Sequence, residues 1–101
     1  MSSHETELRV AAVHPSLPGH FPGHPVVPGV VLLDNVLHQA ELWLGSSVRV
    51  RSLQQAKFMA PLLPEQDAHL TLTLSGDKLR FMIVRGETGI AQGEFIIGTS
   101  A

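Results

Sequence analysis

A single strongly apolar segment, residues 30–44, limits the folds that are open to this chain. Ten of its fifteen residues are apolar, and Gly45-Ser46-Ser47 follows as a stop signal. A helix that is apolar on most sides has to be covered by other elements. The polar residues Asp34, His38 and Glu41 are spaced i, i+4 and i+7, which places them on one narrow face. We therefore expect a helix over residues 30–44 that is enclosed on most sides.

After this segment the hydrophobic pattern changes to the period of two that is typical of strands. Residues 48–59 form a long alternating stretch whose pattern slips near Ser52-Leu53, as a β-bulge would cause. Gly76-Asp77 suits a hairpin turn, and glycines punctuate a second turn at residues 86–89. We expect strands over residues 8–13, 48–59, 70–74, 79–84 and 90–97. An antiparallel meander wrapped around one long buried helix accommodates both patterns, and this α+β arrangement is the hotdog fold.

The length of 101 residues fits one domain, which we expect to span residues 1–101. A chain this short builds a thin core, so dimerisation is an accessible way to stabilise it. The composition, 44% apolar and 16% charged, predicts an ordered protein with an extensive apolar surface. We therefore expect a dimer.

Composition also argues against several functional classes. The absence of cysteine excludes disulfides, thiolate metal sites and a cysteine nucleophile. A formal net charge of -2 without a block of lysine and arginine argues against nucleic acid binding. The sequence contains no apolar run of the roughly 18 residues that span a bilayer, and its first residues lack the pattern of a secretory signal. We expect a cytoplasmic protein without a membrane span.

The segment before the helix is stiffened by proline. Residues 14–29 contain five of the seven prolines, and Pro22, Pro25 and Pro28 follow one another at three-residue intervals. Each proline fixes φ and restricts the residue before it, so this segment is expected to be an extended, rigid loop. Gly29 then leads into a helix whose first turn offers backbone N–H groups. With a histidine in the loop and a carboxyl in the helix, these are the groups needed to move a proton next to a carbonyl.

One ungapped block resembles the signature of the β-hydroxyacyl-acyl carrier protein dehydratases of fatty acid synthesis, the FabZ and FabA types: His20-Phe21-Pro22-Gly23, Pro25, Pro28-Gly29-Val30 and Asp34. A weaker resemblance continues in Lys57-Phe58, Pro61 and Pro64, so the two matches together span residues 19–65. With only nineteen residues before His20, the chain is also similar to the small dehydratase-like proteins of aryl polyene and polyketide-type pathways. Some of those proteins work with a second hotdog subunit, so the resemblance implies either a homodimer or a hotdog heterodimer.

The resemblance implies roles for individual residues. In the family, a histidine and an acidic residue fourteen positions later form an active site that is shared between two subunits, which here implies His20 and Asp34. The backbone amide of Gly29 corresponds to the donor to the thioester carbonyl. Phe21, Val30 and His38 are expected to contact the substrate or to support the catalytic pair. The implied reaction converts (3R)-hydroxyacyl-acyl carrier protein to the trans-2-enoyl form, with acyl carrier protein as partner and no cofactor or metal.

The residues suit this chemistry. An unperturbed histidine titrates near pH ~6.5, which fits a general base. A carboxyl group that delivers a proton needs a partly desolvated environment, which we expect for Asp34 on an otherwise apolar helix. A paired-histidine zinc site is not expected, because Pro22 and Pro25 prevent a helix across His20 and His24.

Two other functions fit the same fold. The chain could be a hotdog subunit without efficient catalysis that completes a partner dehydratase. It could also be a hotdog acyl thioesterase, in which a carboxylate directs water at the thioester. Arg51 and Lys57 are candidate contacts for an acidic carrier protein, although cations on strands are more often simply solvated.

Overall fold

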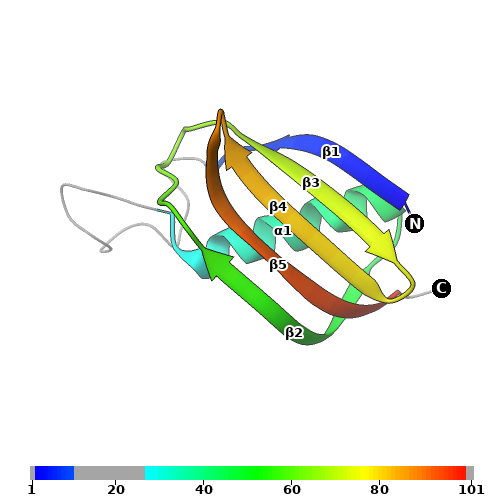
Figure 1. The fold of residues 1–101 in the computed structure, drawn as a ribbon. Coiled ribbons are helices and arrows are strands. Elements are labelled where there is room, and N and C mark those ends of the chain that lie inside the picture. The colour runs from blue at the N-terminus through cyan, green and yellow to red at the C-terminus, as the bar shows by residue number, and fades with distance from the viewer. Residues whose placement is uncertain (1, 11–26, 100–101) are drawn as a thin grey trace.

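The computed structural model describes residues 2–10 and 27–99, which contain one helix and five strands (Figure 1). In chain order these are β1 (Ser2–Leu8), α1 (Gly29–Leu44), β2 (Val48–Phe58), β3 (Ala68–Ser75), β4 (Lys78–Arg85) and β5 (Thr88–Thr99). The strands form one antiparallel sheet in the order β1-β3-β4-β5-β2. The sheet curls around α1, which lies along its concave side (Figure 1). The α+β hotdog arrangement predicted from the sequence is confirmed.

The boundaries of α1 agree with the predicted helix to within one residue. Pro28 is the N-cap, and Gly45 ends the helix with a φ of 71°, a left-handed conformation that favours glycine. The Gly45 N–H donates to the carbonyl of Glu41 at 2.9 Å. The carboxylate of Glu41 accepts a hydrogen bond from the N–H of Val48 at 2.8 Å. Glu41 therefore fixes the turn into β2.

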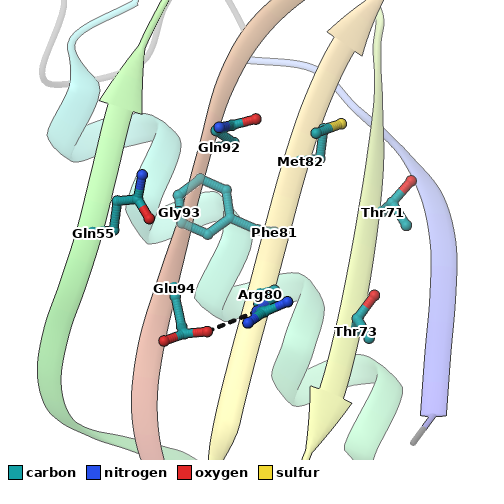
Figure 2. A pocket seen from close by; sticks show the side chains of 9 residues that line it. All are labelled: Gln55, Thr71, Thr73, Arg80, Phe81, Met82, Gln92, Gly93 and Glu94. Carbon is teal, nitrogen blue, oxygen red and sulfur yellow. Dashed lines mark hydrogen bonds and ion pairs between the residues drawn. The ribbon is translucent and has the colours of Figure 1, made fainter.

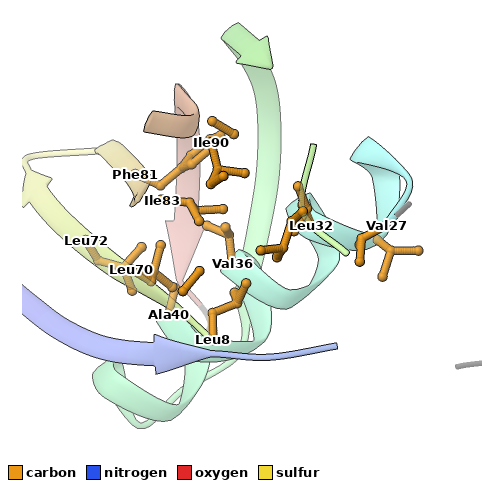
Figure 3. Packing of buried hydrophobic residues seen from close by; sticks show 14 of the residues in the cluster. Leu8, Val27, Leu32, Val36, Ala40, Leu70, Leu72, Phe81, Ile83 and Ile90 are labelled. Atoms are coloured by element: carbon orange, nitrogen blue, oxygen red, sulfur yellow. The ribbon is translucent and has the colours of Figure 1, made fainter. Parts of the chain in front are cut away.

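The core lies between α1 and the concave face of the sheet (Figure 3). One side of the helix is buried, through Val31, Leu32, Val36 and Ala40. The sheet contributes alternate residues of its strands, among them Leu70, Leu72, Leu79, Phe81, Ile83 and Ile90. Burial in β3 and β4 thus alternates with the period of two from which these strands were predicted.

The strand order differs from the predicted meander in one respect. The consecutive strands β3, β4 and β5 do form hairpins, the first of them through Gly76-Asp77. However, β2 pairs with β5 at one margin of the sheet and leaves β3 free to pair with β1. The β2–β5 register shifts between Val50 and Ser52 and again between Leu53 and Gln55. These shifts confirm the irregularity predicted near Ser52-Leu53.

The first strand was predicted in the wrong place. It covers Ser2–Leu8 rather than residues 8–13, of which residues 11–13 lie outside the described part of the chain. Leu8 is the one buried residue in β1, so the strand shows little hydrophobic alternation. Instead, β1 is held by its pairing with β3 and by the stacking of His4 on Trp43, whose ring centroids are 5.5 Å apart. A second, smaller correction is that Gly89 belongs to β5 and not to the turn before it.

His69 of β3 lies between two carboxylates of β1. Its Nε2 is 2.8 Å from Glu5 Oε1, and its Nδ1 is 3.2 Å from Glu7 Oε1. The hydrogen bond to Glu5 and, second, that to Glu7 raise the pKa of His69 above its ordinary value of 6.5. The imidazolium form therefore links β1 to the rest of the sheet.

We expect this link to stabilise the fold in acid and to weaken as the pH rises. Because the pKa is raised in the folded state, the contribution is fully present below pH 6.5 and is lost as the pH rises through the folded-state pKa. An NMR titration of the His69 ring should show a pKa above 6.5, which returns toward 6.5 in the Glu5→Gln/Glu7→Gln variant. The stability advantage over His69→Gln should shrink at alkaline pH, and an advantage that grows with pH would contradict the assignment.

Candidate active site

Asp34 and His38 lie one turn apart on a side of α1 that the sheet does not cover, and both are exposed. Val30 and Leu42 continue this stripe at four-residue intervals and are 72% and 64% exposed. Within the single chain, the predictions of a helix enclosed on most sides and of a partly desolvated Asp34 are therefore wrong. The sheet has one concave face and can bury only one side of the helix. Exposed apolar side chains around a carboxylate indicate an interaction surface.

The N-terminal end of α1 presents backbone donors. The carbonyl of Pro28 accepts hydrogen bonds from the N–H groups of Val31 and Leu32, at 3.0 and 3.2 Å. The N–H groups of Gly29 and Val30 precede the first such bond and have no acceptor within the helix. As a proline, Pro28 also lacks a side-chain oxygen that could cap them. Together with the positive end of the helix dipole, these amides suit an oxygen that carries partial negative charge.

A hollow of about 480 Å³ lies at this end of the helix. It is lined by Val27, Gly29, Leu32, Phe58, Met59, Ala60, Pro61 and Leu62. The ring of Phe58 lies over Gly29, so closely that a Cβ on Gly29 would be 2.8 Å from its Cζ atom. Glycine is thus required for this approach, and the hollow suits an apolar chain that ends in a polarised carbonyl.

Sequence reasoning had not assigned Phe58, Met59 or Leu62 to a site. The signal that could have found them was the weaker family resemblance, since Phe58 and Pro61 belong to it and both line the hollow. The structure brings these residues to the end of α1 because the C-terminal end of β2 lies beside it (Figure 1).

His20 and Phe21, the predicted loop residues of the site, lie outside the described residues. The residues that flank this segment are described. The carbonyl of Val10 accepts a hydrogen bond from the N–H of Glu65, and the N–H of Val27 donates to the carbonyl of Leu62, both at 2.8 Å. Val10 and Val27 are thus both hydrogen-bonded to the short stretch of residues 62–65. Leu62, at the start of this stretch, lines the hollow at the end of α1.

A larger hollow of about 530 Å³ lies on the outer face of the sheet, with the helix on the opposite side (Figure 2). Its lining is mostly polar and includes Thr71, Thr73 and Gln92. Arg80 Nε and Glu94 Oε1 form an ion pair across it at 2.7 Å. The hollow contains none of the predicted site residues and is separated from Asp34 by the sheet, so its size does not make it the active site.

Within residues 2–10 and 27–99, no cluster of three or more histidine, aspartate or glutamate side chains is arranged to hold a metal ion. Over the same ranges, no helix has the length and apolar character needed to cross a membrane.

Comparison with known proteins shows the family of this chain. The profile of the ApeI-like family, ApeI dehydratase, matches residues 1–94. The chain belongs to the ApeI-like dehydratase family. The resemblance to FabZ-type dehydratases is confirmed as well, since the FabZ 3-hydroxyacyl-[acyl-carrier-protein] dehydratase of Thermus thermophilus is 32% identical over 82 residues. That match covers 81% of this chain and 49% of the relative, and the chain spans about half the length of the curated relatives it matches.

Solved structures agree with this family. A chain of the dehydratase heterocomplex ApeI:P from Xenorhabdus doucetiae has a TM-score of 0.83 and 26% identity, over 94% of this chain and 86% of that one. A mutant acyl-CoA hydrolase from Staphylococcus aureus in complex with coenzyme A has a TM-score of 0.68 and 15% identity, over 98% and 65% of the two chains. At that identity the hydrolase shows a shared hotdog fold alone.

Proposed function

We propose that this chain dehydrates (3R)-hydroxyacyl groups carried on acyl carrier protein to the trans-2-enoyl form, in fatty acid synthesis or in an aryl polyene or polyketide-type pathway. One observation carries the proposal. In a member of the ApeI-like dehydratase family, the Gly29 amide opens onto an apolar hollow at the start of the helix that carries Asp34. Carrier-bound chains are substrates of cytoplasmic synthesis, which agrees with the location expected from the sequence.

His20 acts as the base in this proposal. It removes a proton from the carbon next to the thioester carbonyl, and the electron pair that is left moves into the carbonyl to form an enolate. A positioned base of this kind contributes about 10²–10⁴-fold to the rate. The hydrogen bond between Val27 and Leu62 supports this role, because both residues line the hollow and Val27 directly follows the segment that carries His20.

Asp34 and Gly29 complete the reaction. The Gly29 N–H, aided by the helix dipole, binds the carbonyl oxygen as its negative charge grows, and one such donor is worth about 3–4 kcal/mol. The enolate then collapses, expels the hydroxyl from the next carbon, and Asp34 donates the proton with which it leaves as water. Val30 contacts the acyl chain, and His38 positions the Asp34 carboxyl from one helical turn away.

The proposal includes a second hotdog subunit on the exposed side of α1. Val30 and Leu42 are too exposed and apolar to remain in water without cost, and covering them would also exclude water from Asp34. The partial desolvation expected for Asp34 would then arise in the assembly. The fold match to a chain of a dehydratase heterocomplex supports such a pair of subunits.

Mass spectrometry of a synthetic (3R)-hydroxyacyl-carrier protein tests the reaction directly. Incubation with this chain, alone and together with a second hotdog dehydratase subunit, should lower the mass of the carrier by one water. Release of a free acid and bare carrier protein would instead identify a thioesterase. An unchanged carrier mass under both conditions would refute the dehydratase.

A second candidate function is favoured by the exposed position of Asp34. If this chain completes a partner dehydratase without catalysing the reaction itself, dehydration should require the partner and survive loss of Asp34 and His20. Activity that requires both the partner and these two side chains would assign the chemistry to this chain.

Gly29→Ala is expected to lower dehydration at least 10-fold with little effect on stability. The added methyl group displaces the Phe58 ring from Gly29 toward the hollow in which we place the acyl chain. Phe58 is 49% exposed and can move, and alanine is the better helix former by about 1 kcal/mol, so the free energy of unfolding should change by less than about 1 kcal/mol. Turnover and chemical denaturation measure the two effects. In a Phe58→Leu background the Gly29→Ala loss should be smaller, and an equal loss would show that the ring is not its cause.

A further inference from the structure

We propose that the free edge of β2 pairs with a partner strand that carries carboxylates, and not with β2 of a second copy of this chain. The inference rests on the two-subunit site proposed above and adds the chemistry by which the second subunit is chosen. The partner is a hotdog subunit whose edge strand places acidic side chains opposite Arg49, Arg51 and Lys57.

The edge of β2 is long, and all of its charged residues are cations. The strand covers Val48–Phe58 at one end of the sheet order, where it is bonded to β5 along one side only. It carries Arg49, Arg51 and Lys57, all exposed, and no acidic residue. Within residues 2–10 and 27–99, none of the ion pairs involves these three side chains. Their charges are therefore free to be met by a partner.

Two-fold pairing of this strand with a second copy places like charges directly opposite one another in several registers. In an antiparallel pair related by a two-fold axis, residue i lies opposite a residue j for which i + j is constant. An axis near residue 53 places Arg49 opposite Lys57, and an axis near residue 54 places Arg51 opposite Lys57. Six cations and no carboxylate would share a ribbon about 36 Å long. Like charges directly opposite one another destabilise a strand pair.

The same edge is nevertheless too apolar to stay uncovered. Val50, Leu53 and Phe58 of β2 are 39%, 44% and 49% exposed. By register they lie opposite Ile97, Phe95 and Ala91, which are buried residues on the helix side of β5. A long edge strand with exposed apolar side chains is a site of strand addition. The cations exclude an identical strand, and the apolar face still favours one of complementary charge.

A second copy could also offer its other edge, because β1 carries Glu5 and Glu7. Both carboxylates already contact the ring nitrogens of His69, at 2.8 and 3.2 Å. They neutralise that histidine and are a poor counterpart for three further cations. Pairing of β1 with β2 would also leave a free edge on each copy and produce an open chain instead of a closed pair.

A charge-reversed copy of this chain supplies the carboxylates and tests the proposal. The variant Arg49→Glu/Arg51→Glu/Lys57→Glu keeps the shape of the edge and inverts its charge. We expect the natural chain and the variant, each alone, to remain near the monomer mass of 10.9 kDa in light scattering. Mixed one to one, they should form a pair of twice that mass with a dissociation constant at least 10-fold lower than either self-association. The constant should rise about 10-fold between roughly 50 and 500 mM salt.

Two controls separate edge chemistry from other effects. Lys78→Glu/Arg85→Glu reverses two exposed cations of β4, inside the sheet, and should not pair with the natural chain. Arg49→Gln/Arg51→Gln/Lys57→Gln removes the repulsion without adding acids and should pair with itself more tightly than the natural chain does. Circular dichroism confirms that each variant is folded.

The outcomes are decisive and independent of catalysis. Three results would each overturn the proposal. The natural chain alone could form a salt-insensitive dimer, the mixture could gain no mass, or its mass could grow with concentration as an open polymer forms. If the mixed pair forms but no preparation dehydrates the carrier-bound substrate, the edge proposal stands and the proposed function fails. If the natural chain is an active homodimer, the proposed function stands and the edge proposal fails.

Discussion

Asp34→Asn is expected to lower kcat/KM for dehydration by about 10²–10⁴-fold, the usual contribution of a positioned acid or base. An asparagine of the same shape cannot donate the proton with which the hydroxyl leaves. Because Asp34 is exposed within the chain, the free energy of unfolding of the isolated subunit should change by less than about 0.5 kcal/mol. His20→Ala should cause a loss of similar size, and the double variant should be little worse than either single one, because the two groups serve one step.

Asp77→Asn is the matched control, since this aspartate lies in the hairpin turn between β3 and β4, where asparagine is equally suitable. Its kcat/KM should stay within about twofold of the natural chain. The mass of the assembly is measured for every variant. The Asp34→Asn variant could lose activity because its subunits dissociate, and regain it at high partner concentration. That result would show that Asp34 serves the interface and not the reaction.

Gly93→Ala is expected to destabilise the fold by about 3 kcal/mol, the upper part of the range for overpacking a core. A Cβ at this position would lie 2.7 Å from two ring atoms of Phe81 and would collide with the carbonyl oxygen of Gln55. Phe81 is 3% exposed and packs against Phe95, with ring centroids 5.6 Å apart, so a shift of its ring would disturb this packing. The Gln55 carbonyl is part of the β2 backbone, next to the register shift between Leu53 and Gln55. It cannot move aside as a flexible side chain can.

Thermal unfolding measures this effect, and a loss of 3 kcal/mol corresponds to a fall in Tm of about 12–24 °C for a chain of this size. Gly98→Ala is the matched control on the same strand. There a Cβ would lie 3.4 Å from the Nε of Arg51, an exposed side chain that can move, so the Tm should change by only a few degrees. Equal changes in the two variants would contradict the packing argument.

The elements with a strong local pattern were predictable from the sequence. The apolar run of residues 30–44, which Gly45 ends, predicted the bounds of the helix to within one residue. A helix of this composition is stable wherever a sheet covers it. Period-two alternation gave β3 and β4, whose inward side chains fill one core. β1 was misplaced because its residues carry almost no apolar alternation, and its position depends on β3, some 60 residues away.

The sequence predicted which residues form the candidate site, but not the surroundings in which the structure places Gly29 and Asp34. The block that ends at Asp34 indicated the family, which the comparison confirmed. The apolar hollow was not foreseen, because Phe58 and Leu62 meet Gly29 only after β2 has crossed to the margin of the sheet. The exposure of Asp34 was not foreseen either, because helix periodicity does not say which element covers each face.

The amino-acid sequence by itself determined the long helix, the alternating strands and the block that runs from His20 to Asp34, since each depends on residues close together in the chain. Only the tertiary structure decided that β2 forms a free cationic edge and that the Asp34 side of α1 stays uncovered. The physical reason is that burial depends on which distant strands pair, and a single curled sheet can cover only one side of its helix.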